Sequence, residues 1–143
     1  MSRFLKCGSP QAVCMTFLDY SHVELSEEFI AHVLFGEDSD AEKGGHLFGR
    51  KRENKTEFPP SWDEEHITLA LKSVLRQPHV VSFHLPRIIL QKEVDGVYIE
   101  LVLRATNSGL IPHSAFPIYG AGVVQNILGQ QFHLPQPNSR KGK

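Results

Sequence analysis

His32 and His46 stand at the two ends of a loop, within HVLFGEDSDAEKGGHLFG (32–49), that is acidic in its middle and glycine-rich at its close. The ordinary pKa of an imidazole is about 6.5, so histidines can both accept and donate protons near neutral pH. Two imidazoles on opposite sides of a phosphodiester can deprotonate a ribose 2′-hydroxyl and protonate the 5′-oxygen that leaves. A cation is then needed to stabilise the charge that gathers on the phosphoryl oxygens. These residue types are compatible with metal-free, acid–base cleavage of RNA.

The two histidines also admit interpretations as metal ligands or as buried structural residues. Zinc sites use closely spaced Cys and His ligands, whereas the eight histidines of this chain are scattered. Neither Cys7 nor Cys14 has a histidine at zinc-finger spacing. The phosphate-binding, dinucleotide-binding and nucleophile-elbow motifs of other enzyme classes do not occur in the sequence. Acid–base chemistry is therefore favoured, and both alternatives stay open.

Composition limits the partners that the chain can attract through its overall charge. The 143 residues carry a formal net charge of −1, so any polyanion would have to be met locally. One local cluster of cations lies in GRKRENK (49–55), beside the second histidine. No run of about 18 apolar residues predicts a membrane span, and the first residues do not resemble a signal peptide. We expect a soluble chain that binds neither DNA nor membranes.

Two amphipathic segments predict the helices that must position these groups. In LSEEFIAHVLFG, Ser26 is the expected N-cap and Gly36 the expected end, which places His32 near the C-terminus of the helix. In PPSWDEEHITLALKSVLRQP, either Ser61 in a capping box or Asp63 is expected to cap the N-terminus. Apolar residues then recur at helical spacing in both segments. These helices precede the rest of the predicted structure.

The period changes from helical to alternating after residue 79. The segments 79–85, 86–94, 97–105 and 110–120 have the β-branched, apolar composition of strands. Asp95-Gly96 and the turn 107–109 separate neighbouring segments and predict hairpins. Helices followed by antiparallel hairpins indicate an α+β domain.

One domain accounts for most of the chain. We expect it to occupy residues 26–134, with an N-terminal segment 1–25 of uncertain role and a flexible, basic tail at 135–143. Within the N-terminal segment, AVCMTFL (12–18) is apolar enough for a strand or a docked segment. Cys7 and Cys14 are expected to be free thiols, because two cysteines do not make a disulfide framework; the six residues between them also permit a small disulfide loop, and this alternative stays open.

Three segments in the same order resemble the bacterial branch of the EndoU endoribonucleases. IAHVLFGEDSDAEKGGHLFG (30–49) resembles the first EndoU signature, in which two histidines flank a variable loop and a Gly-Gly pair. KTEFPPSWDEEHITLAL (55–71) resembles the lysine-containing signature, and VDGVYIELVLRATNSGLIPHSAFPI (94–118) resembles the closing hairpin with its Ser/Thr-x-aromatic-Pro motif. The resemblance implies a two-lobed fold with an active-site groove between the lobes.

The resemblance also implies roles for individual residues. His32 and His46 match the acid and base of RNA transesterification, and the later histidine is the one usually assigned as the base. The sequence itself leaves open which of the two donates the proton. Lys55 matches the lysine expected to hold the phosphate, and Ser114 the residue that contacts the edge of uracil. Phe116 takes the place of an aromatic residue, often Tyr, on which the base or ribose packs, and here it lacks the hydroxyl.

Three further residues near these motifs have expected roles. Gly45, after Gly44, would allow close backbone approach around His46, and a nearby N–H could bind phosphate. His113 precedes Ser114, and strand alternation would direct it to the opposite face, away from the site. Trp62 is expected in the core.

The implied reaction is cleavage of single-stranded RNA 3′ of uridine, leaving 2′,3′-cyclic phosphate and 5′-hydroxyl ends. The chemistry needs no cofactor, although some EndoU members respond to Mn²⁺. Bacterial members are often toxin modules paired with an immunity protein, which implies RNA or tRNA in the cytoplasm of a target cell as substrate. Two other classes stay open: a non-catalytic RNA-binding or interaction domain of this fold, and a metal-dependent hydrolase that uses His32 and His46 as ligands.

Overall fold

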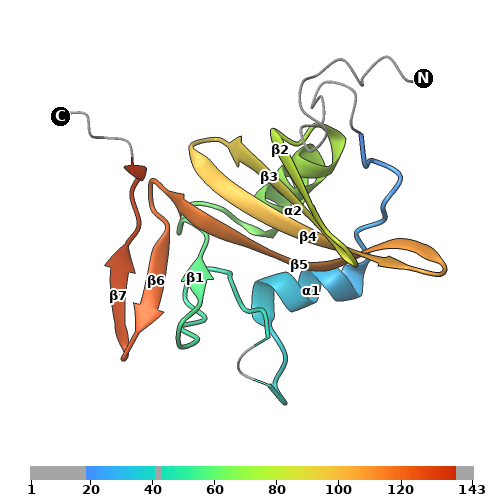
Figure 1. Cartoon of the computed structure of the whole chain (residues 1–143). Coiled ribbons are helices and arrows are strands. Elements are labelled where there is room, and N and C mark those ends of the chain that lie inside the picture. Colours follow the sequence, from blue (N-terminus) through green and yellow to red (C-terminus); the bar gives the residue numbers. More distant parts are fainter. Residues whose placement is uncertain (1–18, 41–42, 138–143) are drawn as a thin grey trace.

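The computed structural model describes residues 19–40 and 43–137, which form two helices and two antiparallel sheets (Figure 1). The α+β class predicted from the sequence is confirmed. The larger sheet has four strands in the order β2-β3-β4-β5, and the smaller has three in the order β1-β6-β7. The elements are α1 (Glu27–Phe35), β1 (Thr56–Glu57), α2 (Glu64–Arg76), β2 (Val80–His84), β3 (Arg87–Val94), β4 (Val97–Thr106), β5 (Gly109–Gly120), β6 (Val124–Ile127) and β7 (Gln130–His133).

The larger sheet is a series of hairpins between neighbours in sequence, as the alternating pattern predicts. The turn between β3 and β4 is Asp95-Gly96, whose φ angles of 50° and 83° are both positive. Glycine adopts this conformation without the steric cost of a side chain, and Asp tolerates it better than most residues. The turn therefore fixes a register in which Val94 pairs with Val97 and Leu90 with Leu101.

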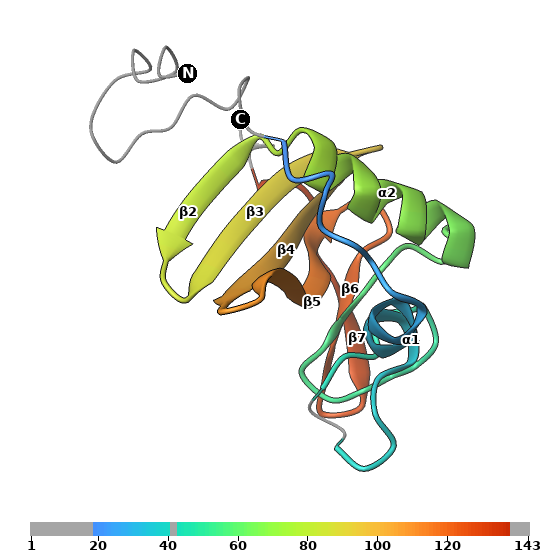
Figure 2. The ribbon, with the colours of Figure 1, turned by 90° about the vertical axis from the view of Figure 1, so that its right-hand side faces the viewer.

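Helix α2 packs on one face of this sheet, and among residues 19–40 and 43–137 no helix covers the opposite face of β2 and β3, which we call the open face (Figure 2). Its apolar stripe, which includes Ile67, Leu71 and Val74, is fully buried together with Leu90 and Leu101 of the strands. Burial of a side chain of this size stabilises the fold by about 1.5–3 kcal/mol. Apolar packing is therefore what holds the larger sheet against α2.

The helix boundaries follow from caps. Ser26 accepts a hydrogen bond from the N–H of Phe29 at 3.1 Å, and α1 ends at Gly36, whose φ is 77°. In α2 the cap is Asp63, which accepts from the N–H of His66 at 2.8 Å, so the Asp63 alternative holds and the Ser61 capping box does not. Trp62 is buried beside the helix start, as expected.

The smaller sheet was not predicted from the sequence, which indicated one antiparallel sheet after the helices. Its strand β1 has only two residues and lies before α2, and it pairs with β6, which comes much later in the chain. Strand β7 is exposed along its whole length, so it shows no alternation of burial. Signals this short and polar do not separate a strand from a loop.

The described part of the N-terminal segment belongs to the folded domain. Tyr20 and Val23 lie in the hydrophobic core, and the N–H of Tyr20 donates to the carbonyl of Leu75 at 2.7 Å. The predicted element at 12–18, Cys7, Cys14 and the end of the tail (138–143) lie outside the described residues. Within residues 19–40 and 43–137, no helix has the length and apolar character needed to cross a membrane.

Candidate functional site

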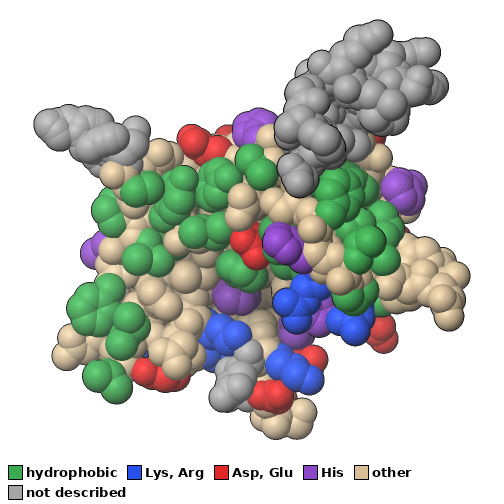
Figure 3. Space-filling model, viewed as in Figure 1, with side chains coloured by type: hydrophobic (Ala, Val, Ile, Leu, Met, Phe, Trp, Pro, Cys, Tyr) green, Lys and Arg blue, Asp and Glu red, His purple; other side chains and the backbone are tan. Residues whose placement is uncertain are grey.

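A cavity of about 800 Å³ lies where α1, β5 and the segment leading into β1 meet. Five of the six site residues predicted from the sequence line it: His32, His46, Lys55, Ser114 and Phe116. Figure 3 shows His, Lys and Arg side chains gathered around a hollow on this face of the molecule, below the four-stranded sheet. Residues far apart along the chain thus share one concave site.

His46 is held rigidly in the wall of the cavity. Its backbone N–H donates to the carbonyl of Val33 at 2.7 Å, and its carbonyl accepts from the N–H of Phe58 at 2.8 Å. Its ring Nδ1 lies 2.6 Å from the carbonyl oxygen of Thr56. Because a carbonyl oxygen can only accept, Nδ1 carries the proton. In the neutral imidazole, Nε2 is then unprotonated and can accept a hydrogen bond.

The surroundings of His46 favour its neutral form. Burial is the main cause that lowers the pKa of its imidazole to about 4; the charges of Lys55 and His32 act in the same direction, against the opposing hydrogen bond to Thr56. Phe116 covers the ring from the opposite wall, with the two ring centroids 5.8 Å apart. A neutral imidazole with an available Nε2 can act as a proton acceptor at pH 7.

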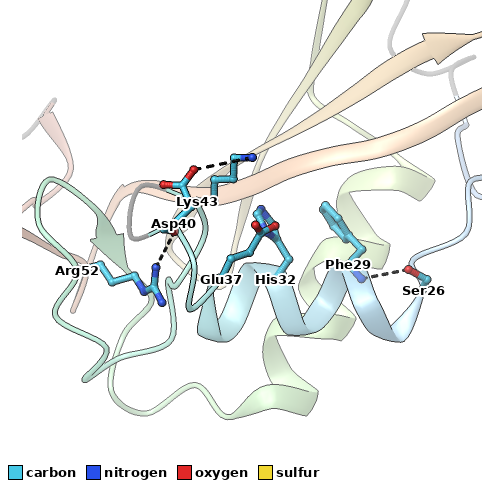
Figure 4. Close-up of polar contacts among 7 residues, drawn as sticks. All are labelled: Ser26, Phe29, His32, Glu37, Asp40, Lys43 and Arg52. Carbon is cyan, nitrogen blue, oxygen red and sulfur yellow. Dashed lines mark hydrogen bonds and ion pairs between the residues drawn. The ribbon is translucent and has the colours of Figure 1, made fainter.

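His32 lies on the exposed side of α1, one turn before its end. Its Nδ1 is 3.3 Å from Oε2 of Glu37, which follows the helix-terminating glycine (Figure 4). Its ring stacks against Phe29, one turn earlier on the helix, with centroids 6.3 Å apart. These two contacts orient an imidazole that is more exposed than that of His46. The acidic loop therefore supplies the residue that orients the first histidine.

The two glycines before His46 bring its backbone against α1. Gly44 and Gly45 have φ angles of 71° and 88°, and a Cβ on Gly44 would collide with the carbonyl oxygen of His32. The predicted close approach is therefore present. Gly45, however, does not line the cavity: its N–H donates to helix carbonyls, and the side chain of Arg52 covers it. The contact with substrate predicted for Gly45 is replaced by a packing role, and Gly44 lines the cavity instead.

The cationic cluster noticed in the sequence is largely directed away from the cavity. Arg50 lies over the ring of Phe35 at 5.8 Å, and the guanidinium of Arg52 donates to the carbonyl of Asp40 (Figure 4). The lysines that line the cavity are Lys43 and Lys55. Local positive charge at the site thus comes from Lys43, shortly before His46, and from Lys55, directly before β1, and not from the run at 50–52.

A buried polar network holds the backbone that carries Lys55. The carbonyl of Lys55 accepts two hydrogen bonds from Asn126 of β6, from its backbone N–H at 3.0 Å and from its side-chain amide at 3.2 Å. The same amide donates to Glu57 at 3.0 Å. This glutamate is fully buried, and backbone N–H groups of Gly49 and Lys51 also donate to it. The carboxylate is thereby fully hydrogen-bonded, as a buried charge must be.

Ser114 and Phe116 project from the open face of the larger sheet. Between them Ala115 points to the core and is buried. The strand register pairs Ser114 with Val102 and Phe116 with Glu100 on that open face. Alternation along β5 therefore delivers both predicted substrate-contacting side chains to the cavity, opposite His46.

His113 also lines the cavity, so the prediction that strand alternation directs it away is wrong. The register shifts here: Val102 pairs with Ser114, but Leu103 pairs with Pro112, which leaves His113 as an extra residue in a β-bulge. A bulge interrupts the strict alternation of side chains and can redirect one of them. The sequence carries a proline at this place, which is a known feature of irregular strands but does not specify the direction of the histidine.

Comparisons with protein-family models, with curated proteins and with solved structures find no match for this chain. Among the residues that the structure describes, no group of three or more His, Cys, Asp or Glu side chains is arranged to hold a metal ion. The site is therefore defined by its own geometry: one buried and one partly exposed imidazole, an adjacent ammonium group, and a wall formed by a hydroxyl and an aromatic ring.

Proposed function

We propose that this chain is an EndoU-type endoribonuclease that cleaves single-stranded RNA 3′ of uridine without a metal. The observation that carries the proposal is that His32, His46 and Lys55 line one cavity, with Ser114 and Phe116 on the facing strand. The order of the three sequence segments that resemble EndoU signatures supports it further.

His46 is the general base in this proposal. Its Nε2 accepts the proton of the ribose 2′-hydroxyl, and the 2′-oxygen attacks the adjacent phosphorus. Its burial and its Nδ1–H bond to Thr56 supply a neutral imidazole of fixed orientation. The P–O5′ bond breaks as the new P–O2′ bond forms, which gives a 2′,3′-cyclic phosphate.

His32 is the general acid. Its imidazolium transfers a proton to the departing 5′-oxygen, which becomes the 5′-hydroxyl of the second product. Glu37 lies 3.3 Å from Nδ1, which fixes the ring and leaves Nε2 as the atom that faces the leaving group. The ammonium group of Lys55 balances the charge that builds on the non-bridging phosphoryl oxygens.

Ser114 and Phe116 supply the preference for uridine. The hydroxyl of Ser114 can both donate and accept a hydrogen bond, as the edge of uracil requires. The ring of Phe116 offers a stacking surface for the base, of the kind that contributes about 1–3 kcal/mol per base in single-stranded complexes.

The decisive experiment maps the ends produced from a defined RNA with a single uridine. Cleavage 3′ of the uridine in the presence of EDTA, leaving a 2′,3′-cyclic phosphate, supports the proposal. A His46→Ala variant should lose about 10²–10⁴-fold in rate, the usual contribution of general base catalysis. Activity abolished by EDTA would favour a metal-dependent hydrolase, and binding of RNA without any cleavage would favour a non-catalytic RNA-binding domain.

We propose further that the domain acts as a toxin on RNA in the cytoplasm of a target cell, where tRNA would be a substrate, and that an immunity protein inhibits it by covering the cavity. Expression of the wild-type chain should arrest growth, and the His46→Ala variant should not. Growth arrest by both would show that the toxicity does not depend on the nuclease chemistry.

A further inference from the structure

Two arginines lie opposite each other on the open face of the larger sheet. Arg87 of β3 and Arg104 of β4 are register partners, and both are exposed. Like charges placed directly opposite each other destabilise a strand pair. Within the described residues, no carboxylate forms an ion pair with either guanidinium. A bound anion would relieve the repulsion between the two arginines.

The arginine pair has its own shallow cavity, of about 510 Å³. His84 and Pro86, at the β2–β3 turn, and Ile89 complete its lining. His84 is itself the register partner of Arg87. Two guanidinium groups and an imidazole therefore lie side by side around one concave surface.

This surface lies on the same sheet as β5, which lines the cavity that contains His32 and His46. Arg104 and Val102 lie on the same face of β4, and Val102 pairs with Ser114 of the catalytic cavity. His113, in the bulge beside Ser114, links the two places. Burial lowers the pKa of its imidazole, and the charges of Arg104, Arg87, His32 and Lys43 lower it further, in that order. The imidazole of His113 is thus within the electrostatic field of cations from both cavities.

We propose that Arg87 and Arg104 form a second phosphate subsite, which holds a phosphate of the RNA strand beyond the one that is cleaved. The inference rests on the proposed ribonuclease function and extends it to substrate length. Guanidinium groups bind phosphate oxygens in a bidentate manner, and Arg87 and Arg104 stand directly opposite each other on neighbouring strands. The strand then runs from Phe116 and Ser114, past His113, to the arginines.

The test compares a uridine-containing dinucleotide, which has a single phosphate, with oligonucleotides extended on the 5′ side, on the 3′ side or on both. In the wild-type chain, at least one extension should raise kcat/KM. In an Arg87→Gln/Arg104→Gln variant, the ratio of kcat/KM for the extended substrate to that for the dinucleotide should fall by about tenfold. The extension that loses its advantage identifies the side of the strand that the arginines hold.

A matched control removes two positive charges from the far side of the sheet. Lys72 and Arg76 are exposed on α2, and the Lys72→Gln/Arg76→Gln variant should keep the wild-type ratio. Equal ratios in the wild type and the Arg87/Arg104 variant would overturn the subsite while leaving the ribonuclease function intact. The same is true if both double variants lower the ratio equally, because the effect would then be one of net charge.

A binding measurement keeps the subsite testable even if no RNA is cleaved. The probe is a fluorescent oligonucleotide with 2′-deoxyuridine at the cleavage position, which cannot form the cyclic product. Titrations at several salt concentrations give the slope of log affinity against log salt. In the Arg87→Gln/Arg104→Gln variant this slope should be smaller by about 0.7 for each phosphate that is no longer neutralised. An unchanged slope would overturn the proposed subsite.

If the slope changes but no RNA is cleaved, the nuclease function alone is rejected.

Discussion

The two walls of the cavity are built by different physical means. The wall formed by β5 belongs to a sheet of consecutive hairpins, packed on α2 through apolar side chains such as Leu101. The wall that carries Lys55 is supported by the smaller sheet, in which β1 pairs with a strand much later in the chain. There the buried groups are a carboxylate and amides. One wall depends on burial of apolar area, and the other on complete hydrogen bonding of a buried charge.

Because of this contrast, substitutions in the two walls should disturb the cavity in two different ways. Apolar packing is non-directional and tolerates small shifts, whereas a buried carboxylate must keep every donor. Loss of apolar volume should therefore weaken the whole fold. Loss of a donor or acceptor should first displace the segment 54–57 and the lysine within it. The following variants test that difference, from the largest expected effect to the smallest.

Leu101→Ala attacks the apolar wall. Leu101 is fully buried in the centre of β4, so its truncation should lower the free energy of unfolding by about 2–5 kcal/mol. Urea unfolding monitored by far-UV circular dichroism measures this loss. At temperatures where the variant is still folded, kcat/KM should stay close to the wild-type value. A specific loss of activity in the fully folded variant would contradict the division between the walls.

Acidification tests His46, which lies in the wall opposite Phe116. Its folded-state pKa of about 4 is below the unfolded value of about 6.5, so the unfolded chain binds the proton first. The free energy of unfolding should therefore decline as pH falls from about 6.5 to about 4, by about 3 kcal/mol from this group. A His46→Asn variant should lose that component. Parallel urea titrations at pH 7 and pH 4.5 check it, and identical pH slopes would refute it.

Glu57→Gln changes the buried network beside Lys55 while keeping the size and shape of the side chain. The new amide would place its NH2 group against the backbone donor of either Gly49 or Lys51, at a cost of about 1–3 kcal/mol. Because Lys55 depends on the same network, we expect kcat/KM for RNA to fall by at least tenfold, more than the loss of stability explains. The control is Glu53→Gln, whose exposed carboxylate accepts from Leu128 and Gly129 in the same region. Equal effects of the two substitutions would contradict the importance of burial.

Asp63→Ala removes the N-cap of α2, the helix that packs against the larger sheet. Removal of the side chain that accepts from the N–H of His66 should cost about 1 kcal/mol. Ser61→Ala, two residues earlier and exposed, should change the free energy of unfolding by less than about 0.5 kcal/mol. Thermal unfolding of both variants distinguishes them, and a larger effect at Ser61 would restore the capping-box interpretation.

The division between the walls also explains what the sequence could predict. The hairpins of the larger sheet, both helices and the positions of Ser26 and Gly36 follow from local periodicity and capping, and these were predicted correctly. Convergence of His32, His46 and Lys55 was anticipated only through the resemblance to EndoU signatures. The positions of Asn126 and Glu57 in the network depend on contacts between residues about seventy positions apart. No local pattern specifies such contacts.

The error over His113 has a related origin. Strict alternation holds only while a strand keeps its register, and the shift between Val102 and Leu103 breaks it. Bulges depend on how two strands meet and not on either sequence alone. Gly45 lies close to the backbone of α1, as expected, but it does not line the cavity, because the side chain of Arg52 lies against it. This contact between residues seven positions apart has no signature in the sequence.

The dependence of Lys55 on β6 has a consequence for the order in which the protein is made. Asn126, which donates twice to the carbonyl of Lys55, and Gln131, which donates to Glu57, are synthesised after every residue of the proposed catalytic set. A nascent chain that has emerged only as far as β5 already contains both histidines, Lys55, Ser114 and Phe116, but not the strand that supports the lysine. The backbone of Lys55 therefore reaches its full set of hydrogen bonds only once β6 and β7 have left the ribosome.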